Sequence, residues 1–305
     1  MHSAVTLVDA APAAVSVGRP RLAGGLSTVP VVAVLLIFFV LPMLYLVRMS
    51  LSPEKAMISP LFGTYAVAQY VRLLLDPFFY EMISNSLALG VCTVVLTLLM
   101  GYPVAYYLVG TRGWERTLIS AACLLPLFVN AVSGILGWYI LLLPFGVVQK
   151  LLVALDLHEG PFRGLRSFWA LVGVLAYENL PFAVLILASS LQAVPREKIQ
   201  AARILGASMG RVLWTILVPL TLPGIFATVV LTFSLSLSSY LVPLLISGSS
   251  IKVLPIAIFT YTSDLLDWPY AAAMALLLLL IVLLVTYALT VATNMLSRRG
   301  KWEPV

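Results

Sequence analysis

Long apolar runs separated by short polar segments make up most of this chain. A helix needs about 20 mostly apolar residues to cross the hydrocarbon core of a bilayer. Six runs come close to that length, so the pattern predicts an all-α polytopic membrane protein with six transmembrane helices. The predicted spans lie at about 29–47, 82–108, 118–142, 168–191, 220–247 and 269–294.

The polar segments between these runs divide the chain further. We expect a flexible tail over 1–26, a transmembrane domain over 27–297 with a polar loop at 192–217, and a second tail over 298–305. Two short surface helices are predicted outside the spans, at 65–75, ended by Asp76-Pro77, and at 147–155. A cleaved signal peptide is the alternative at the N-terminus, because Arg19 and Arg21 precede the first run. That run is too long for a cleaved core.

The composition fits lipid as the surrounding solvent. The chain is 62% hydrophobic and 10% charged, with a mean hydropathy of +1.07, which is more apolar sequence than a water-soluble core needs. Its net charge of +6 lies at the ends of the spans and forms no patch, which argues against nucleic acid as a partner. Both cysteines, Cys92 and Cys123, fall in apolar spans and are expected to be inert packing residues.

The distribution of charge predicts the orientation. The tails, the loop at 111–117 and the loop at 192–217 carry eleven basic residues against four acidic ones, whereas the remaining loops carry seven of each. Basic residues are enriched in cytoplasmic segments of membrane proteins. We therefore expect both termini and the segment 196–219 to lie in the cytoplasm.

The segment 196–219, REKIQAARILGASMGRVLWTILVP, is the most polar stretch in the middle of the chain. Pro195 can start a short helix that runs to about Leu205. Gly206 should end it, because glycine readily adopts the left-handed conformation of a helix C-terminus. A second helical turn is expected from about Ser208 into the next span.

This spacing resembles the cytoplasmic EAA loop of ABC importer permeases. The resemblance is carried by Ala201-Ala202, Gly206, Ile216 and Pro219, while the usual glutamate is replaced by Gln200. In that family the loop is a coupling helix that docks on an ATPase subunit. The resemblance therefore implies a set of ATPase-coupling residues: Arg196, Gln200, Ala201, Ala202, Gly206, Ala207, Ile216 and Pro219.

Two further strings resemble the spermidine/putrescine-type members of this family. They are PLFVNAVSGILGWYILL at 126–142, where the family commonly has arginine at the position of Gly134, and LDWPYAAA at 266–273. The resemblance implies a second permease subunit, which we expect to be a different chain, two ATPase subunits with ATP and Mg²⁺, and an extracytoplasmic binding protein. No cofactor is expected in this chain. A polyamine is the favoured solute, with iron, thiosulfate, aminophosphonates and opine-type compounds as alternatives.

Glu178 is the residue most directly suggestive of a translocation pathway. It lies ten residues into the fourth predicted span, about 15 Å along a helix axis and near the middle of the bilayer. A charged group there is costly unless it faces water, a partner or a pathway. The functional interpretation is that it faces a cationic solute; the alternative is a structural carboxyl, protonated or bonded to Tyr177, Asn179 or a neighbouring helix.

Five other polar or aromatic residues of the spans are candidates for the pathway, with packing as the alternative for each. Serines in membrane helices often serve close packing, and aromatic rings can face a cation. These candidates are Asn130, Trp138, Ser234, Ser238 and Tyr240. Asp264 and Asp267 are interpreted as solvated loop acids, with attraction of cations at an outer mouth as the alternative.

The sequence argues against an enzyme. It has no G-x-x-x-x-G-K-[ST] loop for nucleotide phosphates and no Gly-x-Ser-x-Gly pattern near a histidine. His2 and His158 are too few and too far apart to suggest a metal site. The other function classes that fit a polytopic chain are a secondary transporter driven by an ion gradient and a membrane scaffold without a solute.

Overall fold

The computed structural model of this chain describes residues 23–53, 66–155, 165–248 and 250–299, and every regular element in those ranges is a helix. The chain forms two compact units, Met1–Leu46 and Val47–Val305. The prediction of an all-α membrane protein is confirmed. The expectations for the tails at 1–22 and 300–305 and for His158 lie outside the described residues.

The first unit contains most of α1 (Ala23–Ser50), which is long and apolar enough to cross a membrane. Between Val32 and Leu46 its side chains are largely exposed, as expected for a helix whose surroundings are lipid or another protein. The last residues of α1, from Val47 onward, belong to the second unit.

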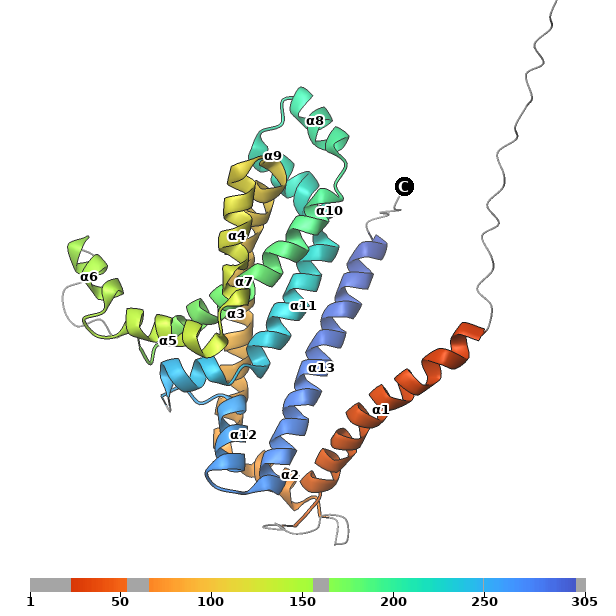
Figure 1. Cartoon of the computed structure of the whole chain (residues 1–305), viewed down its shortest axis with the longest axis vertical. Helices are drawn as coiled ribbons and strands as arrows, with labels where there is room; N and C mark the ends of the chain where they lie inside the picture. The colour runs from red at the N-terminus through yellow and green to blue at the C-terminus, as the bar shows by residue number, and fades with distance from the viewer. Residues whose placement is uncertain (1–22, 54–65, 156–164, 249, 300–305) are drawn as a thin grey trace, which may run out of the picture. The chain divides into compact units, whose positions relative to one another are not determined.

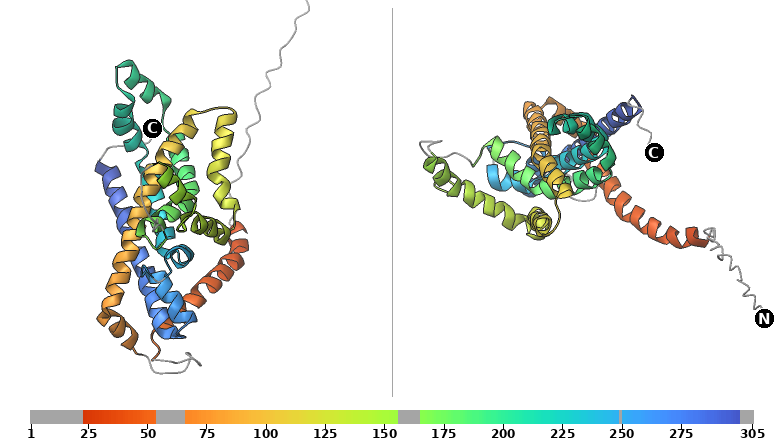
Figure 2. Two further views of the ribbon diagram at one scale, coloured as in Figure 1. Left: turned by 90° about the vertical axis from the view of Figure 1, so that its left-hand side faces the viewer. Right: turned by 90° about the horizontal axis from the view of Figure 1, so that it is seen from above.

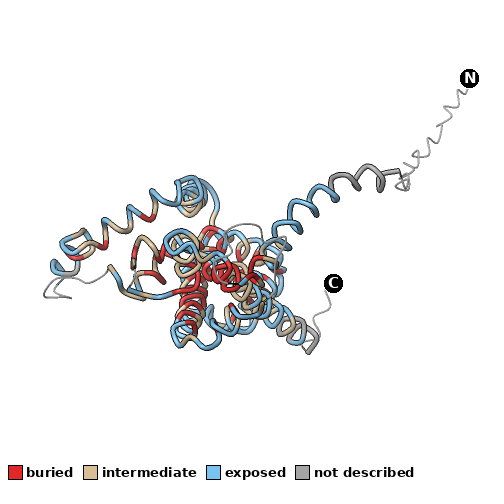
Figure 3. The backbone as a smooth tube through the Cα atoms, turned by 90° about the horizontal axis from the view of Figure 1, so that it is seen from below, coloured by how far each residue is buried: buried red, intermediate tan, exposed pale blue. Residues whose placement is uncertain are grey.

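Three helices form the centre of the second unit: α3 (Pro77–Gly110), α7 (Phe168–Gln192) and α11 (Leu222–Ser238). Small residues allow their backbones to approach closely. A Cβ atom at Gly90 would meet the ring of Phe233, and one at Gly101 would meet Ala183. Figure 3 shows the buried residues concentrated in the middle of the helical bundle, and α3, α7 and α11 each contribute several of them.

Within the residues that the structure describes, four helices are individually long and apolar enough to span a membrane: α1, α3, α7 and α13 (Trp268–Arg299). Two further pairs pass the same test only together, and each pair is sharply bent. If each bent pair is counted as one span, the described residues (Figure 1) hold six spans, which is the number that the hydrophobic pattern predicted.

The third predicted span, 118–142, is not one continuous helix. It consists of α4 (Trp114–Phe128) and α5 (Ala131–Leu142), which meet at 105°. α4 ends where the Val129 N–H bonds back to the Pro126 carbonyl, and α5 starts where the Asn130 side chain accepts the Val132 N–H. This asparagine cap supplies one of the partners that the first turn of a helix lacks, so a new helix can begin in a new direction.

The fifth predicted span, 220–247, was wrong at both ends. Helix begins earlier, as α9 (Met209–Val212), the π-helical turn η1 (Leu213–Leu217) and α10 (Val218–Leu220), and turns by 70° into α11. Proline has no N–H to donate, so Pro219 and Pro223 weaken the helix at this bend. α11 stops at Ser238, and a separate π-helical turn, η2 (Pro243–Ser247), follows.

The predicted loop at 248–268 contains an additional helix, α12 (Leu254–Ser263). Its ten residues are too few to cross a bilayer. The side chain of Ser86 on α3 accepts the Leu254 N–H at 3.0 Å and thereby satisfies one unpaired donor of the first turn.

The three predicted short helices are present. α2 (Ala68–Leu75) is followed by its C-terminal cap, Asp76, and α6 (Val147–Ala154) follows α5. α8 (Arg196–Ile204) ends shortly before Gly206, whose φ is +81°. Figures 1 and 2 show α8 at one end of the second unit and α2 with α12 at the opposite end.

Candidate functional site

The break between α4 and α5 opens a hollow of about 260 Å³ against α7. Two of the predicted pathway residues, Asn130 and Glu178, line it together although they lie on different helices. Gly134 also lines it, where a larger side chain would fill part of the space. The complete lining is Pro126, Leu127, Val129, Asn130, Ala131, Gly134, Tyr177 and Glu178.

Glu178 is the only ionisable carboxylate of this lining, and it is half-buried. Within the described residues its carboxylate has neither a hydrogen bond nor an ion pair. The alternative of a bond to Asn179 is not observed, because the Asn179 amide donates to the Leu175 carbonyl at 2.7 Å and to Ser236 Oγ at 3.3 Å. The carboxylate is therefore available to a group that enters the hollow.

The end of α4 adds to the negative character of the hollow. Its last turn, at Pro126 and Leu127, lines the hollow, and the C-terminus of a helix carries a partial negative charge on its unpaired carbonyls. The N-terminus of α5 opposes this at the same break, but the Asn130 side chain already occupies one of its N–H groups at 3.0 Å. No residue of the lining is basic, so a cation fits this site better than an anion.

Trp138 belongs to the same region through an aromatic contact. Its ring lies 5.3 Å from that of Tyr177, edge to face at 68°, and Tyr177 itself lines the hollow. Tyr177 was not among the candidates, although its place beside Glu178 in the sequence could have suggested it. The pair gives one wall an aromatic surface that can cover alkyl carbons or face a cation.

Ser234, Ser238 and Tyr240 are not part of this hollow. The two serine hydroxyls donate to backbone carbonyls one turn earlier, of Val230 at 2.8 Å and of Ser234 at 2.6 Å. Tyr240 stacks on Phe259 of α12, with ring centroids 5.6 Å apart. The serine that does reach another helix is Ser236, the partner of Asn179.

The loop at the other end of α7 divides into an anchored and an exposed part. One buried apolar cluster is formed by the ends of α3 and α7 nearest this loop, with Val212 of α9 and Leu217 of η1, and Ile199, Ala202, Ala207 and Ile216 pack against it. Arg196, Gln200, Ala201 and Gly206 are exposed, and Pro219 is half-buried. Ile204 and Leu205 are 85% and 87% exposed, at the tip of the loop. Large apolar side chains that are this exposed commonly mark a surface for a protein partner.

The comparisons with known proteins agree with this architecture. Residues 94–299 match the family described as binding-protein-dependent transport system inner membrane component. The spermidine/putrescine transport system permease protein PotB of Escherichia coli is 28% identical over 276 residues, covering 90% of this chain and 99% of that protein. PotB of Haemophilus influenzae is 26% identical over 277 residues, covering 90% and 96%.

Solved structures share the fold at low sequence identity. One is a bacterial alginate ABC transporter in complex with its alginate pentasaccharide-bound periplasmic protein. It aligns with a TM-score of 0.72 at 18% identity, covering 93% of this chain and 96% of the other. The methionine ABC transporter MetNI in an inward-facing conformation aligns with a TM-score of 0.52 at 16% identity, covering 74% and 99%. The match to the family spans well over half of the sequence, so this chain is a member of the inner-membrane components of binding-protein-dependent transport systems.

Proposed function

We propose that this chain is a membrane-embedded permease subunit of an ATP-driven ABC importer for a polyamine such as putrescine or spermidine. Its partners are a second permease subunit, two ATPase subunits that bind ATP and Mg²⁺, and an extracytoplasmic binding protein. The proposal is supported by family membership and by relatives, named as spermidine/putrescine permeases, that align over nearly their whole length.

We assign coupling to the ATPases to α8 and to the exposed side chains at its end, Ile204 and Leu205. Ile199 and Ala202 hold the helix on the bundle, while Ile204 and Leu205 face outward and offer an apolar contact to a groove. Closure of the ATPases on ATP would move α8 and, through the α7 and α9 ends that flank it, change the access to the pathway. This requires α8 to lie in the cytoplasm, as the excess of basic residues in the loops on this side predicts.

Acidic substitutions at Ile204 and Leu205 test whether this surface docks on the ATPase subunits. Ile204→Asp and Leu205→Asp should each weaken capture of the ATPase subunits by on the order of tenfold or more, because a carboxylate would lose its water in an apolar groove. Leu155→Asp, also at a highly exposed leucine but after α6, is the matched control. Co-purification of the ATPases with the tagged chain measures the effect. Equal capture by all three variants would remove α8 from the docking surface.

One observation carries the choice of a cationic solute: the unpaired carboxylate of Glu178 faces a hollow without a basic residue. In this position the carboxylate would meet an ammonium group of the polyamine, and the rings of Tyr177 and Trp138 would lie beside its alkyl chain. A hydrogen bond to a charged group contributes roughly 1.5–3 kcal/mol, or a factor of about 10 to 100.

The test is uptake of labelled putrescine and spermidine by the complete importer. Glu178→Gln should lower uptake by on the order of tenfold or more. Glu178→Asp should retain part of it, since it keeps the charge. Glu115→Gln on α4 is the matched control, because that exposed carboxylate lies outside the hollow. Unchanged uptake and solute preference in Glu178→Gln would exclude the cation site.

Another solute is the second candidate, and one relative favours it. The molybdenum transport system permease protein ModB of Azotobacter vinelandii is 31% identical over 166 residues, which is 54% of this chain. Competition of molybdenum compounds, iron, thiosulfate, aminophosphonates and opines against labelled putrescine separates these possibilities. Uptake that continues without the ATPase subunits would instead favour an ion-gradient transporter.

A further inference from the structure

At the end of the second unit opposite α8, two membrane helices begin with an aspartate that caps its own first turn. Asp76 precedes α3, and its Oδ1 accepts the Phe78 N–H at 3.0 Å. Asp267 precedes α13, and its Oδ1 accepts the Tyr270 N–H at 3.4 Å. Each carboxylate therefore uses one oxygen on its own helix, which leaves its second oxygen for another partner.

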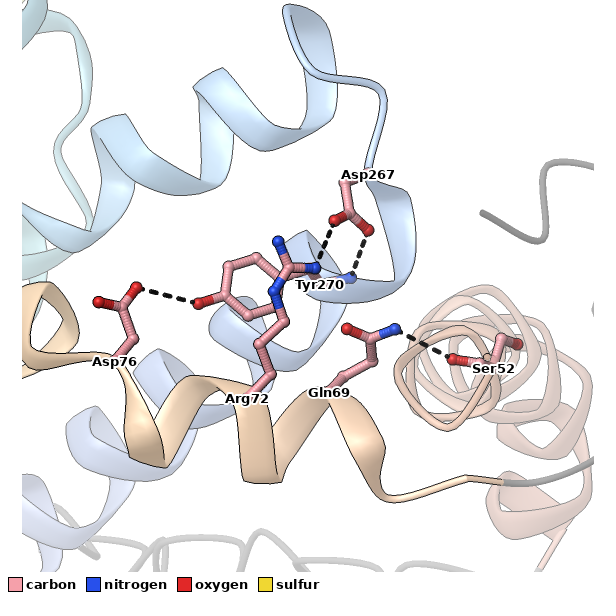
Figure 4. Close-up of polar contacts among 6 residues, drawn as sticks. All are labelled: Ser52, Gln69, Arg72, Asp76, Asp267 and Tyr270. Carbon is pink, nitrogen blue, oxygen red and sulfur yellow. Dashed lines mark hydrogen bonds and ion pairs between the residues drawn. The ribbon is translucent and has the colours of Figure 1, made fainter. Parts of the chain in front are cut away.

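In both cases the second oxygen binds a different element (Figure 4). Asp267 Oδ2 pairs with Arg72 Nη1 of α2 at 2.9 Å. Asp76 Oδ2 accepts the hydroxyl of Tyr270, on α13, at 3.5 Å. The cap of α3 thus holds α13, and the cap of α13 holds α2, which leads directly into α3.

Arg72 and Tyr270 also contact each other. The guanidinium carbon of Arg72 lies 4.3 Å from the centre of the Tyr270 ring, over its face. Other neighbours of Tyr270 are apolar or aromatic: the Tyr261 ring lies 4.7 Å away in an edge-to-face contact, and Leu73, Phe79 and Met274 belong to the same buried cluster. Tyr270 is only 1% exposed, so its hydroxyl gives up water for the bond to Asp76.

Neighbouring segments are attached to the same group. Gln69 of α2 donates to the Ser52 carbonyl at 3.5 Å, and the hydroxyls of Tyr70 and Ser50 lie 2.8 Å apart, so the end of α1 is bonded to α2. On the other side, Asn85 of α3 donates to the Lys252 carbonyl at 3.1 Å, just before α12. Together with the bonds of Asp76 and Asp267, polar contacts thus connect five segments at this end of the unit: the end of α1, α2, α3, the residues before α12, and α13.

We propose that Arg72, Asp76, Asp267 and Tyr270 form a double-cap clamp that stays closed throughout the transport cycle, so that the starts of α3 and α13 move as one body. The conformational change then falls on the bent pairs α4–α5 and α9–α11. α4 supports this division, because none of its residues is buried within the chain. The inference rests on the proposed importer function in one respect: it assumes a cycle in which the pathway opens first to one side of the membrane and then to the other.

The test measures distances in the complete importer reconstituted in nanodiscs. Cys92 and Cys123, the only cysteines of the chain, are first replaced by serine. One spin-label pair is placed at the exposed residues Leu75, directly before Asp76, and Leu265, two residues before Asp267. A second pair is placed at Leu75 and Phe128, the exposed last residue of α4. Distances are compared between the nucleotide-free and the ATP–vanadate-trapped importer.

The clamp predicts that the Leu75–Leu265 distance changes by less than about 2 Å, while the Leu75–Phe128 distance changes by several ångström. A Leu75–Leu265 distance that changes with nucleotide would show that the clamp opens. Two unchanged distances in an importer that takes up solute would overturn the assignment of movement to the bent pairs. Absence of uptake by the labelled and the parent importer alike would count against the proposed function and not against the clamp.

A second measurement uses the full chain alone in detergent. Asp267→Asn keeps a good helix cap but removes the charge that pairs with Arg72, and Tyr270→Phe keeps the ring but removes the hydroxyl. Both should speed amide hydrogen exchange in α2 and in the first turn of α13 by about tenfold or more. The control Glu81→Gln breaks the exposed pair with Lys252, at 3.4 Å, and should leave these amides unchanged. Exchange that is equally slow in all variants would show that the four residues do not hold the helices together.

Discussion

Asn179 of α7 donates a hydrogen bond to Ser236 of α11, with Nδ2 and Oγ 3.3 Å apart and both residues buried. Successive residues of a helix point about 100° apart, so fixing Asn179 toward α11 turns Glu178 toward a different neighbour. Glu178 therefore lines the hollow at the break between α4 and α5. The buried amide therefore orients the carboxylate on which the proposed cation site depends.

This bond should contribute measurably to stability. Replacing Asn179 by Ala should lower the free energy of unfolding by about 1 kcal/mol, because the Ser236 hydroxyl loses its partner on α7. The midpoint of thermal unfolding in detergent measures the change. Ser234→Ala is the control, since the Ser234 hydroxyl bonds only within α11, to Val230. A double variant of Asn179 and Ser236 that costs the sum of the two single changes would contradict a direct coupling.

Gly224 of α11 lies against Ser190 of α7, with no room for a side chain between the two helices. A Cβ atom at this position would overlap the side chain of Ser190, so Gly224→Ala must push the two helices apart. Overpacking of this kind typically costs about 1–3 kcal/mol. We expect low yield and a lower unfolding temperature for Gly224→Ala, with recovery in the double variant that also carries Ser190→Gly.

Gly173 of α7 provides the matched control for Gly224. A Cβ atom there has no atom within 4 Å, so Gly173→Ala should be tolerated or slightly stabilising. Loss of stability in Gly173→Ala as large as in Gly224→Ala would mean that the effect arises from the helix backbone and not from the contact with Ser190.

Gly206 ends α8 with a φ of +81°. Alanine in this left-handed conformation costs about 1 kcal/mol or more, so Gly206→Ala should shift the end of α8 and weaken coupling to the ATPases. Solute-stimulated ATP hydrolysis by the reconstituted importer should fall several-fold. Gly210→Ala in α9, where φ is ordinary and the space is open, should hydrolyse ATP like the parent.

Asn130 has two interpretations that a pair of substitutions separates. Its side chain caps α5, so Asn130→Ala should lower stability by about 1 kcal/mol and disturb the hollow, whereas Asn130→Ser retains a capping oxygen. If the cap is its main contribution, the serine variant should take up putrescine nearly as well as the parent. A serine variant as defective as the alanine variant would indicate that the amide itself contacts the solute.

Local signals in the sequence were sufficient for much of the fold. The limits of α8 followed from Pro195 and Gly206, and the end of α2 followed from Asp76-Pro77, because caps and breakers act on neighbouring residues. The predicted start of α2 at 65 was three residues too early, since the helix begins at Ala68. The long apolar runs predicted α3, α7 and α13, because a helix that crosses a bilayer needs about 20 mostly apolar residues. For the hollow, the position of Glu178 within its span was enough to single it out.

Contacts between distant residues and changes of direction could not be predicted in this way. The hydrophobic run through 118–142 continues across the break at Asn130, and hydropathy contains no information about the direction of a helix. Asp267 was interpreted as a solvated loop acid, but it pairs with Arg72, which lies 195 residues earlier in the chain. Ser234 and Ser238 matched a one-turn spacing, yet that spacing also suits bonds within their own helix.

The two bare apolar side chains at the tip of α8, Ile204 and Leu205, have a consequence for how the cell must produce this chain. If the ATPase subunits dock on these side chains as proposed, a copy synthesised without them would leave both exposed to chaperones and proteases. Balanced synthesis of the subunits should therefore govern how long the newly inserted chain survives, and overproduction of this chain alone should shorten its half-life.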